Sequence, residues 1–434
     1  MTNKNSNKES VNITNYRREY TESQRRGVKT WLTDILNELK ISDQTIEYQA
    51  SIQKMSDLIN RDAVVRMYLT KMLEQSHGNT RFDTEDESGL ITTIDTLLLV
   101  MNYIVTRAPN FVYDEKNPDL TGAYTFPLSS LFTEMMATEA GESAFRNAAF
   151  NNALTEVLQA WCDYLDSDAS TSVLNHEKNG WLSAQGQEYT ELYKFVTEPG
   201  HPHLGFTSYN DFFHRKIKEE LRPIASPADP KVIASPNDGT VYKIASNIEK
   251  STDFWAKGQT YSLANILNND ADYVNHFTGG NMVQTFLSGN DYHRFHSPID
   301  GTVEKVEVVQ GLTFSQRSSE KEPGAGTESL GYEAAVNTRG LLYIRSNDKT
   351  LGTVCIIPIG ITEISSVRFG DHIKPGYQVT KGEEVGHFSY GGSTLCLLFQ
   401  PGAIKNFVVE PTESQSGAQA GSVVKVNAQI ATAN

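Results

Sequence analysis

The chain has 434 residues, of which 38% are hydrophobic and 21% are charged, a composition ordinary for a globular protein with a sizeable core. Its length suggests two or three domains, because a single core stops growing at about 250–300 residues. The formal net charge of −15 disfavours nucleic acid and anionic membrane surfaces as electrostatic partners, since both repel an acidic body.

Several features bear on where the protein resides. Residues 1–15 are polar and contain no apolar run, so they predict a disordered tail and no signal peptide. The most apolar early run, residues 90–105, is short for a membrane span and contains polar residues, which favours a core helix. The three cysteines have no CxxC spacing, as expected of free thiols in a reducing compartment. We therefore expect a cytoplasmic protein without stable membrane insertion.

Residues 16–185 show the apolar spacing of helices. Trp31, Ile35 and Leu39 recur at four-residue steps, and a similar pattern runs through residues 142–165. No proline or glycine interrupts that second stretch, so it predicts one helix. This part of the chain therefore predicts an all-helical N-terminal domain.

Residues 200–434 have a different texture. Short apolar runs bounded by Gly, Pro, Asp, Asn or Ser predict strands. These runs are residues 232–234, 239–244, 283–287, 301–309, 340–344, 352–359 and 395–399. Their spacing predicts a mostly antiparallel β domain of barrel or sandwich type, and hence an α+β chain.

A seven-residue pattern occurs twice in this second part. Residues 235–241 and 297–303 both read Ser-Pro-x-Asp-Gly-Thr-Val, a turn followed by a strand, which indicates internal duplication. An Asp in such a turn most often caps nearby amides. That simpler interpretation applies to Asp238 as well as to Asp300.

The junction between the two parts is rich in Pro, Gly and His. His201 and His203 lie close together, but a metal site needs three or more ligands in fixed geometry. We therefore predict no metal site.

Two glycines precede Ser393-Thr394 and the apolar run 395–399. The simpler interpretation is a turn relaxed by glycine that enters a buried strand, because Gly-Gly often stands before strands. The alternative is that Ser393 is a nucleophile toward its own backbone. That alternative requires a base elsewhere in the chain.

Candidates for this base lie in residues 290–298, where His293 and His296 flank Arg294. Buried histidines often serve only packing, but an Asp that orients a His that deprotonates a Ser is a recognised arrangement. Asp238, His296 and Ser393 are the candidates for these roles. No GxSxG motif is present, so an α/β-hydrolase is poorly supported.

Residues 286–301 resemble the Tyr-His-Arg-x-His block of the phosphatidylserine decarboxylase family. Further blocks of the family follow the same order: residues 206–224, 238–241, 257–263 and 391–394. In the last block Gly391 stands where the family's Leu-Gly-Ser-Thr motif has Leu. The resemblance covers about residues 200–410.

This resemblance implies that Ser393 attacks the Gly392 carbonyl and that the zymogen divides between residues 392 and 393. Elimination and hydrolysis would then leave a pyruvoyl cofactor derived from Ser393. The resemblance implies His296 as the base, Asp238 as its orienter and His293 as a proton donor during decarboxylation. The pyruvoyl ketone would form a Schiff base with a substrate amine and accept electrons from the bond that breaks. The fragment 393–434 would remain as a partner of the rest of the chain.

The helical N-terminal part resembles the soluble fungal tryptophan decarboxylase branch of this family, including residues 179–182 and 205–209. This favours a soluble L-amino acid, of aromatic type, over phosphatidylserine as the substrate. Two alternatives from another class stay open: a carrier module like lipoyl domains, with Lys381 in a hairpin turn, and a cleaved but inactive interaction protein. The sequence is compatible with a homo-oligomer.

Overall fold

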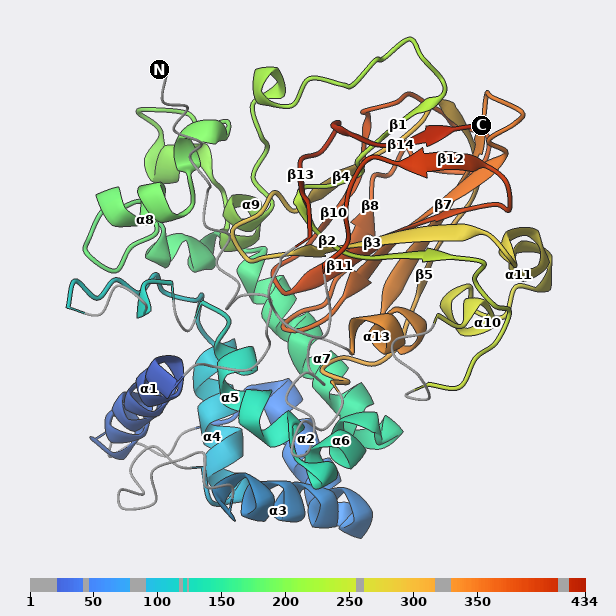
Figure 1. Ribbon diagram of the computed structural model, residues 1–434. Helices are drawn as coiled ribbons and strands as arrows, with labels where there is room; N and C mark the ends of the chain where they lie inside the picture. The colour runs from blue at the N-terminus through green and yellow to red at the C-terminus, as the bar shows by residue number, and fades with distance from the viewer. Residues whose placement is uncertain are drawn as a thin grey trace, which may run out of the picture.

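Helices fill the first half of the chain and strands dominate the second half (Figure 1). The computed structural model describes residues 22–41, 47–78, 91–116, 120–122, 125–254, 261–316, 329–412 and 421–434. The tail predicted at residues 1–15 and the family signature at Lys257 and Gly258 lie outside these ranges.

The helical region gathers on one side of the molecule (Figure 1). It contains α1 (Glu22–Ile41), α2 (Ala50–Arg61), α3 (Ala63–Gly78), α4 (Ile94–Val105), α5 (Pro127–Met136), α6 (Glu139–Arg146), α7 (Ala148–Leu165), η3 (Asp168–Val173), α8 (Ala184–Tyr189) and η4 (Leu192–Lys194). Shorter helices accompany the strands: η5 (Pro202–Gly205), α9 (Tyr209–Phe213), η6 (Glu219–Leu221), α10 (Leu263–Ile266), α11 (Ala271–Phe277) and α13 (Leu330–Val336).

The single helix predicted over residues 142–165 is wrong. Asn147 leaves the helical conformation at φ −67° and ψ 120°, and its side chain accepts a hydrogen bond from Phe150 N at 3.1 Å. This is an N-cap, which Asn favours because its side chain competes with the helical backbone. The stretch therefore forms the end of α6 and the whole of α7.

The strands of the second half are all antiparallel to their partners. They are β1 (Val232–Ala234), β2 (Gly239–Ser246), β3 (Asn281–Leu287), β4 (Arg294–His296), β5 (Gly301–Val309), β6 (Arg339–Ser346), β7 (Thr353–Gly360), β8 (Val367–Phe369), β9 (Gln378–Val379), β10 (Glu384–Phe388), β11 (Ser393–Phe399), β12 (Ile404–Phe407), β13 (Val423–Val424) and β14 (Gln429–Ala433). The seven predicted strands are confirmed. Strands β4, β8, β9, β10 and β12 to β14 were not predicted from the sequence.

An eight-stranded sheet in the order β13-β2-β3-β11-β7-β6-β5-β9 is accompanied by two three-stranded sheets, β1-β14-β12 and β4-β10-β8. The strands at the two edges of the large sheet do not pair with each other, so the sheets are open and the barrel alternative is wrong. The predicted α+β class and antiparallel arrangement are confirmed.

Strand β11 runs through the middle of the large sheet and is buried along its whole length. Leu395, Leu397 and Phe399 belong to a core shared with the two small sheets. Cys396 and Leu398 belong to a core on the opposite face, which α10, α11 and α13 cover. Alternate side chains therefore serve opposite faces, as a strand buried on both sides requires.

The predicted duplication is visible in the backbone hydrogen bonds of the two repeated turns. Ala234 N donates to Pro298 O at 3.1 Å, and His296 N donates to Pro236 O at 2.8 Å. The two turns therefore lie against each other in a reciprocal arrangement, each followed by a strand of the large sheet.

The helical region is packed directly onto the β region. Its core cluster includes Tyr292, Ile364 and Tyr390 from the second half of the chain. The ring of Tyr390 lies 5.5 Å from that of Trp161 in α7, in an edge-on arrangement. The two regions thus share one core, and the predicted domain division between residues 185 and 200 stays a prediction.

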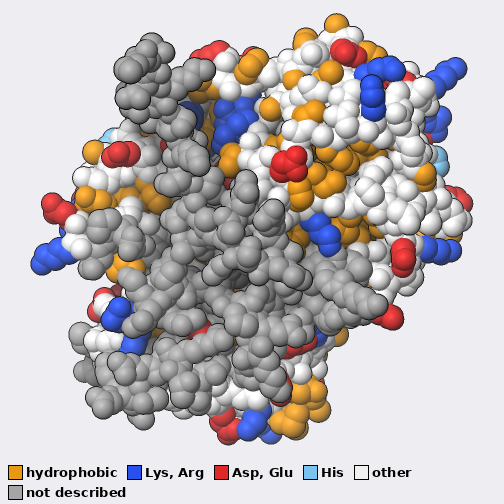
Figure 2. All heavy atoms as spheres, in the orientation of Figure 1, with side chains coloured by type: hydrophobic (Ala, Val, Ile, Leu, Met, Phe, Trp, Pro, Cys, Tyr) orange, Lys and Arg blue, Asp and Glu red, His pale blue; other side chains and the backbone are white. Residues whose placement is uncertain are grey.

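The surface shows no separation of charges by sign in the part that is visible. Figure 2 shows acidic and basic side chains interspersed over the described surface on this face. Among the helices that the structure describes, none has both the length and the apolar character needed to cross a membrane.

Candidate active site

Ser393 is the first residue of β11 and is 1% exposed. It pairs with Leu287 of β3 on one side and with Gly360 of β7 on the other. Its side chain points to the same face as Leu395, because side chains alternate along a strand. Among the described residues its Oγ has no hydrogen-bond partner. A buried hydroxyl without a partner is unusual and calls for an explanation.

The two glycines before Ser393 lie against Thr362, in the segment that follows β7. A Cβ on Gly391 would lie 2.4 Å from Thr362 O, and one on Gly392 would lie 2.6 Å from Thr362 Oγ1. Gly391 also has φ +148°, a conformation that L side chains rarely adopt. Ile361 N donates to Gly392 O at 2.9 Å. The carbonyl next to Ser393 is thus held and polarised by a backbone N–H.

His296, at the end of β4, has both ring nitrogens occupied. Nδ1 lies 2.7 Å from Gly382 O, and Nε2 lies 2.8 Å from Tyr292 Oη. A carbonyl can only accept, so Nδ1 carries the proton and Nε2 of the neutral ring accepts from Tyr292. Burial lowers the pKa of His296, opposed in part by the Gly382 carbonyl and by the charges of Glu384 and Asp238.

Asp238 lies in the first repeated turn and is 2% exposed. Arg222 binds it through two hydrogen bonds, Nε to Oδ1 at 3.0 Å and Nη2 to Oδ2 at 2.5 Å. Val426 N also donates to Oδ1, at 2.8 Å, and Lys425 Nζ lies 3.5 Å from Oδ2. No hydrogen bond joins Asp238 to His296 in the described part of the chain. Asp238 acts on His296 through its charge alone.

The other repeated turn offers a comparison for Asp238. Asp300 accepts from Lys381 N at 2.8 Å, which matches the bond from Val426 N to Asp238. Accepting a hydrogen bond from a backbone N–H is therefore common to the Asp of both turns. The pairing with Arg222 distinguishes Asp238.

Strand register brings these residues to one end of the large sheet. Thr240 of β2 and Thr394 of β11 pair with the same residue, Phe286 of β3, from opposite sides. Neighbouring strands lie about 4.8 Å apart, so the backbones of these two strands are about 10 Å apart here. The turn that carries Asp238 and the end of β11 that carries Ser393 thus lie at the same end of the large sheet. His296 is bonded to that turn through Pro236.

His293 is fully buried, and its ring lies 4.1 Å from that of Phe213. Neither of its ring nitrogens has a hydrogen-bond partner among the described residues. Burial, together with the positive charge of Arg215, lowers the pKa of His293 to about 3. His293 is therefore neutral at physiological pH.

A small cavity lies at the seam of the helical and β regions, lined in part by Phe213, whose ring contacts that of His293. Its lining includes Phe126, Trp181, Phe213, Arg215 and Tyr390. Its volume of about 10 Å³ is room for about one water molecule. In the uncleaved chain this cavity is too small for an amino acid side chain.

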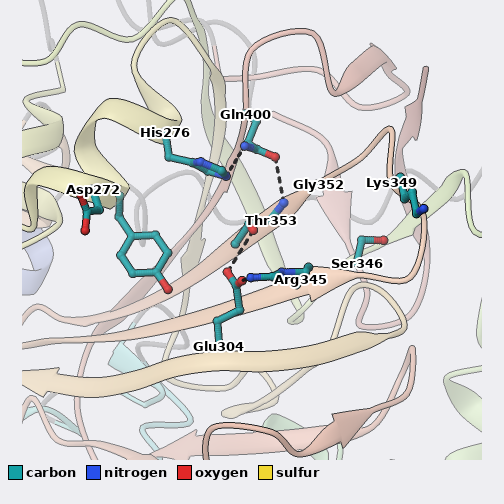
Figure 3. A pocket seen from close by; sticks show the side chains of 10 residues that line it. Asp272, His276, Glu304, Arg345, Ser346, Lys349, Gly352, Thr353 and Gln400 are labelled. Atoms are coloured by element: carbon teal, nitrogen blue, oxygen red, sulfur yellow. Dashed lines mark hydrogen bonds and ion pairs between the residues drawn. The ribbon is translucent and has the colours of Figure 1, made fainter.

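A larger pocket of about 400 Å³ lies elsewhere, between α11 and strands of the large sheet (Figure 3). His276, Glu304, Arg345 and Gln400 are among its lining residues, and Thr353 Oγ1 donates to Glu304. None of the site residues predicted from the sequence lines it. Cavity size therefore does not locate the candidate site.

The carrier module with Lys381 and the possible metal ligands His201 and His203 can both be compared with the structure. Lys381 is 4% exposed, and its Nζ donates to the carbonyls of Ser226 and Asp229, so it is not the accessible lysine that a carrier domain needs. Strands β9 and β10 pair with other strands and not with each other.

At the junction, His203 Nδ1 lies 2.6 Å from the carbonyl oxygen of Leu174. The described residues contain no group of three or more metal-ligating side chains.

Comparison with known proteins identifies the family of the chain. A family model described as phosphatidylserine decarboxylase matches residues 209–430, and a second model with that description matches residues 49–190. The chain belongs to the phosphatidylserine decarboxylase family, and its activity is that of a decarboxylase.

Three relatives illustrate how far the similarity extends. Decarboxylase iboD of Amanita muscaria is 33% identical, over 71% of this chain and 94% of its own length. L-tryptophan decarboxylase of Psilocybe cubensis is 27% identical, over 88% of this chain and 85% of its own. Phosphatidylserine decarboxylase proenzyme 3 of Schizosaccharomyces pombe is 32% identical, over 48% of this chain and 20% of its own.

His293 should make the uncleaved chain sensitive to acid. Its pKa is about 3 in the folded chain and about 6.5 in an unfolded one, so between these values only the unfolded state binds the proton. Stability therefore falls as the pH decreases from about 6.5 toward 3, by up to about 1.4 kcal/mol per pH unit. His293→Phe, which retains a ring against Phe213, should remove that share of the slope. Urea unfolding of Ser393→Ala chains at pH 6, 5 and 4 measures it.

The matched control is His201→Gln, because the His201 side chain is exposed. A His293→Phe chain with the same pH dependence as the control would contradict the assignment of a neutral buried histidine.

Proposed function

We propose that this chain is a pyruvoyl-dependent decarboxylase of a free L-amino acid, and that it matures by cleaving itself between Gly392 and Ser393. The observation that carries the proposal is the pairing of a buried, unpartnered Ser393 Oγ with an adjacent Gly392 carbonyl that accepts a hydrogen bond from Ile361 N. The hydroxyl and the polarised carbonyl are the two groups that an acyl shift needs.

Maturation would proceed in three steps. Ser393 Oγ attacks the Gly392 carbonyl carbon, its proton goes to a base, and the C–N bond breaks to give an ester and a free amine. Removal of the Ser393 α-proton then expels the Gly392 carboxylate. Water hydrolyses the resulting enamine, through its imine tautomer, and releases ammonia, which leaves a pyruvoyl group at the start of residues 393–434.

We assign the base to His296, acting through Nε2. Tyr292 Oη now donates to that nitrogen, so a proton from Ser393 can reach His296 only if Tyr292 relays it or moves aside. The Gly382 carbonyl fixes the tautomer, which is the role that the sequence alone suggested for Asp238. In this proposal Asp238 favours the protonated form of His296 through its charge.

A pyruvoyl carbonyl supplies an electron sink for the bond between the substrate's Cα and its carboxylate. The residues present fit such a group, because Ser393 lies buried at one end of the large sheet and Thr362 leaves no room for side chains before it. We assign proton donation to His293, which as a neutral imidazole has a single N–H to give. Phe213 would fix the plane of its ring.

The proposed substrate is a soluble amino acid with an aromatic side chain. The support is the length of the matches: the iboD and tryptophan decarboxylase matches cover 71% and 88% of this chain, whereas the Schizosaccharomyces pombe phosphatidylserine decarboxylase match covers 48%. Phosphatidylserine is the second candidate, because the family models carry its name. The three cysteines are free and buried, which accords with a cytoplasmic location.

The purified protein should release carbon dioxide from a free amino acid, with tryptophan as the first to try. Activity should be measured with separate amino acids and with phosphatidylserine vesicles. Activity on the vesicles alone would contradict the proposed substrate class. Borohydride added with the substrate should attach it to the fragment 393–434, whereas an inactive interaction protein would remain unlabelled.

Asp238→Ala and Asp300→Ala should differ in cleavage. Each removes the acceptor of a backbone N–H, which destabilises by about 1–3 kcal/mol. Asp238→Ala also leaves Arg222, whose side chain is 11% exposed, without its carboxylate, which adds to the loss. Only Asp238→Ala removes a charge that acts on His296, so only this variant should slow conversion of the full chain into two fragments on denaturing gels. Equal cleavage in both variants, with both folded, would reduce Asp238 to a turn residue.

A further inference from the structure

The segment after β7 runs along the residues that precede Ser393. Ile361 N donates to Gly392 O at 2.9 Å, and Ile364 N donates to Tyr390 O at 3.2 Å. The two segments are thus joined on both sides of Gly391. The position of the Gly392 carbonyl therefore depends on how this segment is held.

Glu363 lies between these two hydrogen-bonding residues and is fully buried. Its backbone has φ +56°, which is uncommon for a residue with a side chain. A Cβ on Gly391 would lie 3.3 Å from Glu363 Cβ. The Glu363 side chain thus starts beside the cleavage segment, on a backbone that its surroundings hold in an unfavourable conformation.

The carboxylate of Glu363 reaches the helical region. Its Oε1 accepts from Ser129 N at 2.6 Å, a contact between residues 234 positions apart in the chain. Ser129 lies in the first turn of α5, whose N-cap residue, Phe126, makes no side-chain capping bond. Helix N-termini need acceptors for their free N–H groups, so Glu363 supplies from outside what α5 lacks. Oε2 of Glu363 has no partner among the described residues.

A second contact ties the same segment to the same helix. The ring of Tyr390 stacks on that of Phe126 at 5.3 Å and an angle of 5°. The hydroxyl of Tyr390 donates to Thr125 O. The start of α5 therefore holds the cleavage segment through Tyr390 and its neighbouring segment through Glu363.

We propose that Glu363 is a positioning residue through which the helical region sets the Gly392 carbonyl for attack by Ser393. The helical region would then be an internal maturation factor, required for self-cleavage before any substrate binds. This inference rests on the proposed cleavage between Gly392 and Ser393. Burial raises the pKa of Glu363 to about 7, so the carboxyl can exist in both forms near neutral pH. Burial raises the pKa of Tyr209 in α9, and the charge of Glu363 raises it further.

Variants at Glu363 separate its hydrogen bond from its charge. Glu363→Gln keeps the acceptor for Ser129 N without the charge. Glu363→Asp keeps the charge but withdraws the carboxylate by one methylene. Glu363→Ala removes both. The matched control is Thr138→Ala, which removes the N-cap acceptor of α6, at 2.9 Å from Gly141 N, away from the cleavage segment.

The rate to measure is the conversion of freshly synthesised full-length chain into residues 1–392 and 393–434, followed on denaturing gels. Glu363→Ala and Glu363→Asp should slow it about 10- to 100-fold, as misplacement of reacting groups does. Glu363→Gln and Thr138→Ala should cleave close to the wild-type rate. Near-UV circular dichroism checks that each full-length chain is folded. If Glu363→Ala does not fold, the cleavage rates of Glu363→Gln and Glu363→Asp are compared instead, and they test the inference.

Cleavage of folded Glu363→Asp and Glu363→Ala at the rate of Thr138→Ala would overturn the inference while the wild type still divides at Ser393. A wild-type chain that never divides, or a Ser393→Ala chain that does, would instead overturn the proposed function.

Discussion

Thr362 lies so close to the backbone of Gly391 and Gly392 that neither position has room for a side chain. This closeness places Ile361 N on the Gly392 carbonyl and brings the end of β7 alongside the start of β11. A bulkier residue at either glycine would push the two segments apart and remove the hydrogen bond to the carbonyl. The chemistry proposed for Ser393 thus depends on the close packing of Thr362 against the two glycines that precede Ser393.

The helical region takes part in this constraint. Its core includes Tyr390, three residues before Ser393, and the start of α5 is capped by Glu363 from the segment that contains Thr362. The burial of these residues also explains the electrostatics, since burial is the main cause of the lowered pKa of both His293 and His296. Helical and β regions therefore build one site, although most of its predicted chemical groups come from the β region.

The sequence predicted the parts of this arrangement that are local. The apolar run of β11, the repeated Ser-Pro-x-Asp-Gly-Thr-Val turns and the family blocks all lie within short stretches of chain. Strands β4 and β9, of three and two residues, are too short for an alternation pattern to identify them, whereas β1, as short as β4, was predicted because it is a continuous apolar run. The break between α6 and α7 was missed because a single Asn at position 147 can cap a helix without any proline or glycine.

Contacts between distant segments could not be predicted in this way. Arg222 as partner of Asp238, Gly382 as partner of His296, and Glu363 as partner of Ser129 each join residues that carry no shared local pattern. A role for Tyr292 could have been suspected, because Tyr292 belongs to the Tyr-His-Arg-x-His block, but the block does not indicate which residue it hydrogen-bonds. The Asp, His and Ser expected from the motifs thus lie near one end of the large sheet without a hydrogen bond from Asp238 to His296. Asp238 acts on His296 through its charge, and Tyr292 is hydrogen-bonded to Nε2 of His296.

The most direct test is the intact mass of the protein after purification, compared with Ser393→Ala. Two chains should appear, residues 1–392 and residues 393–434, and the smaller should be lighter by one ammonia than a chain that begins with serine. The Ser393→Ala protein should remain a single chain. A single undivided chain in a preparation that releases carbon dioxide from its substrate would contradict the account.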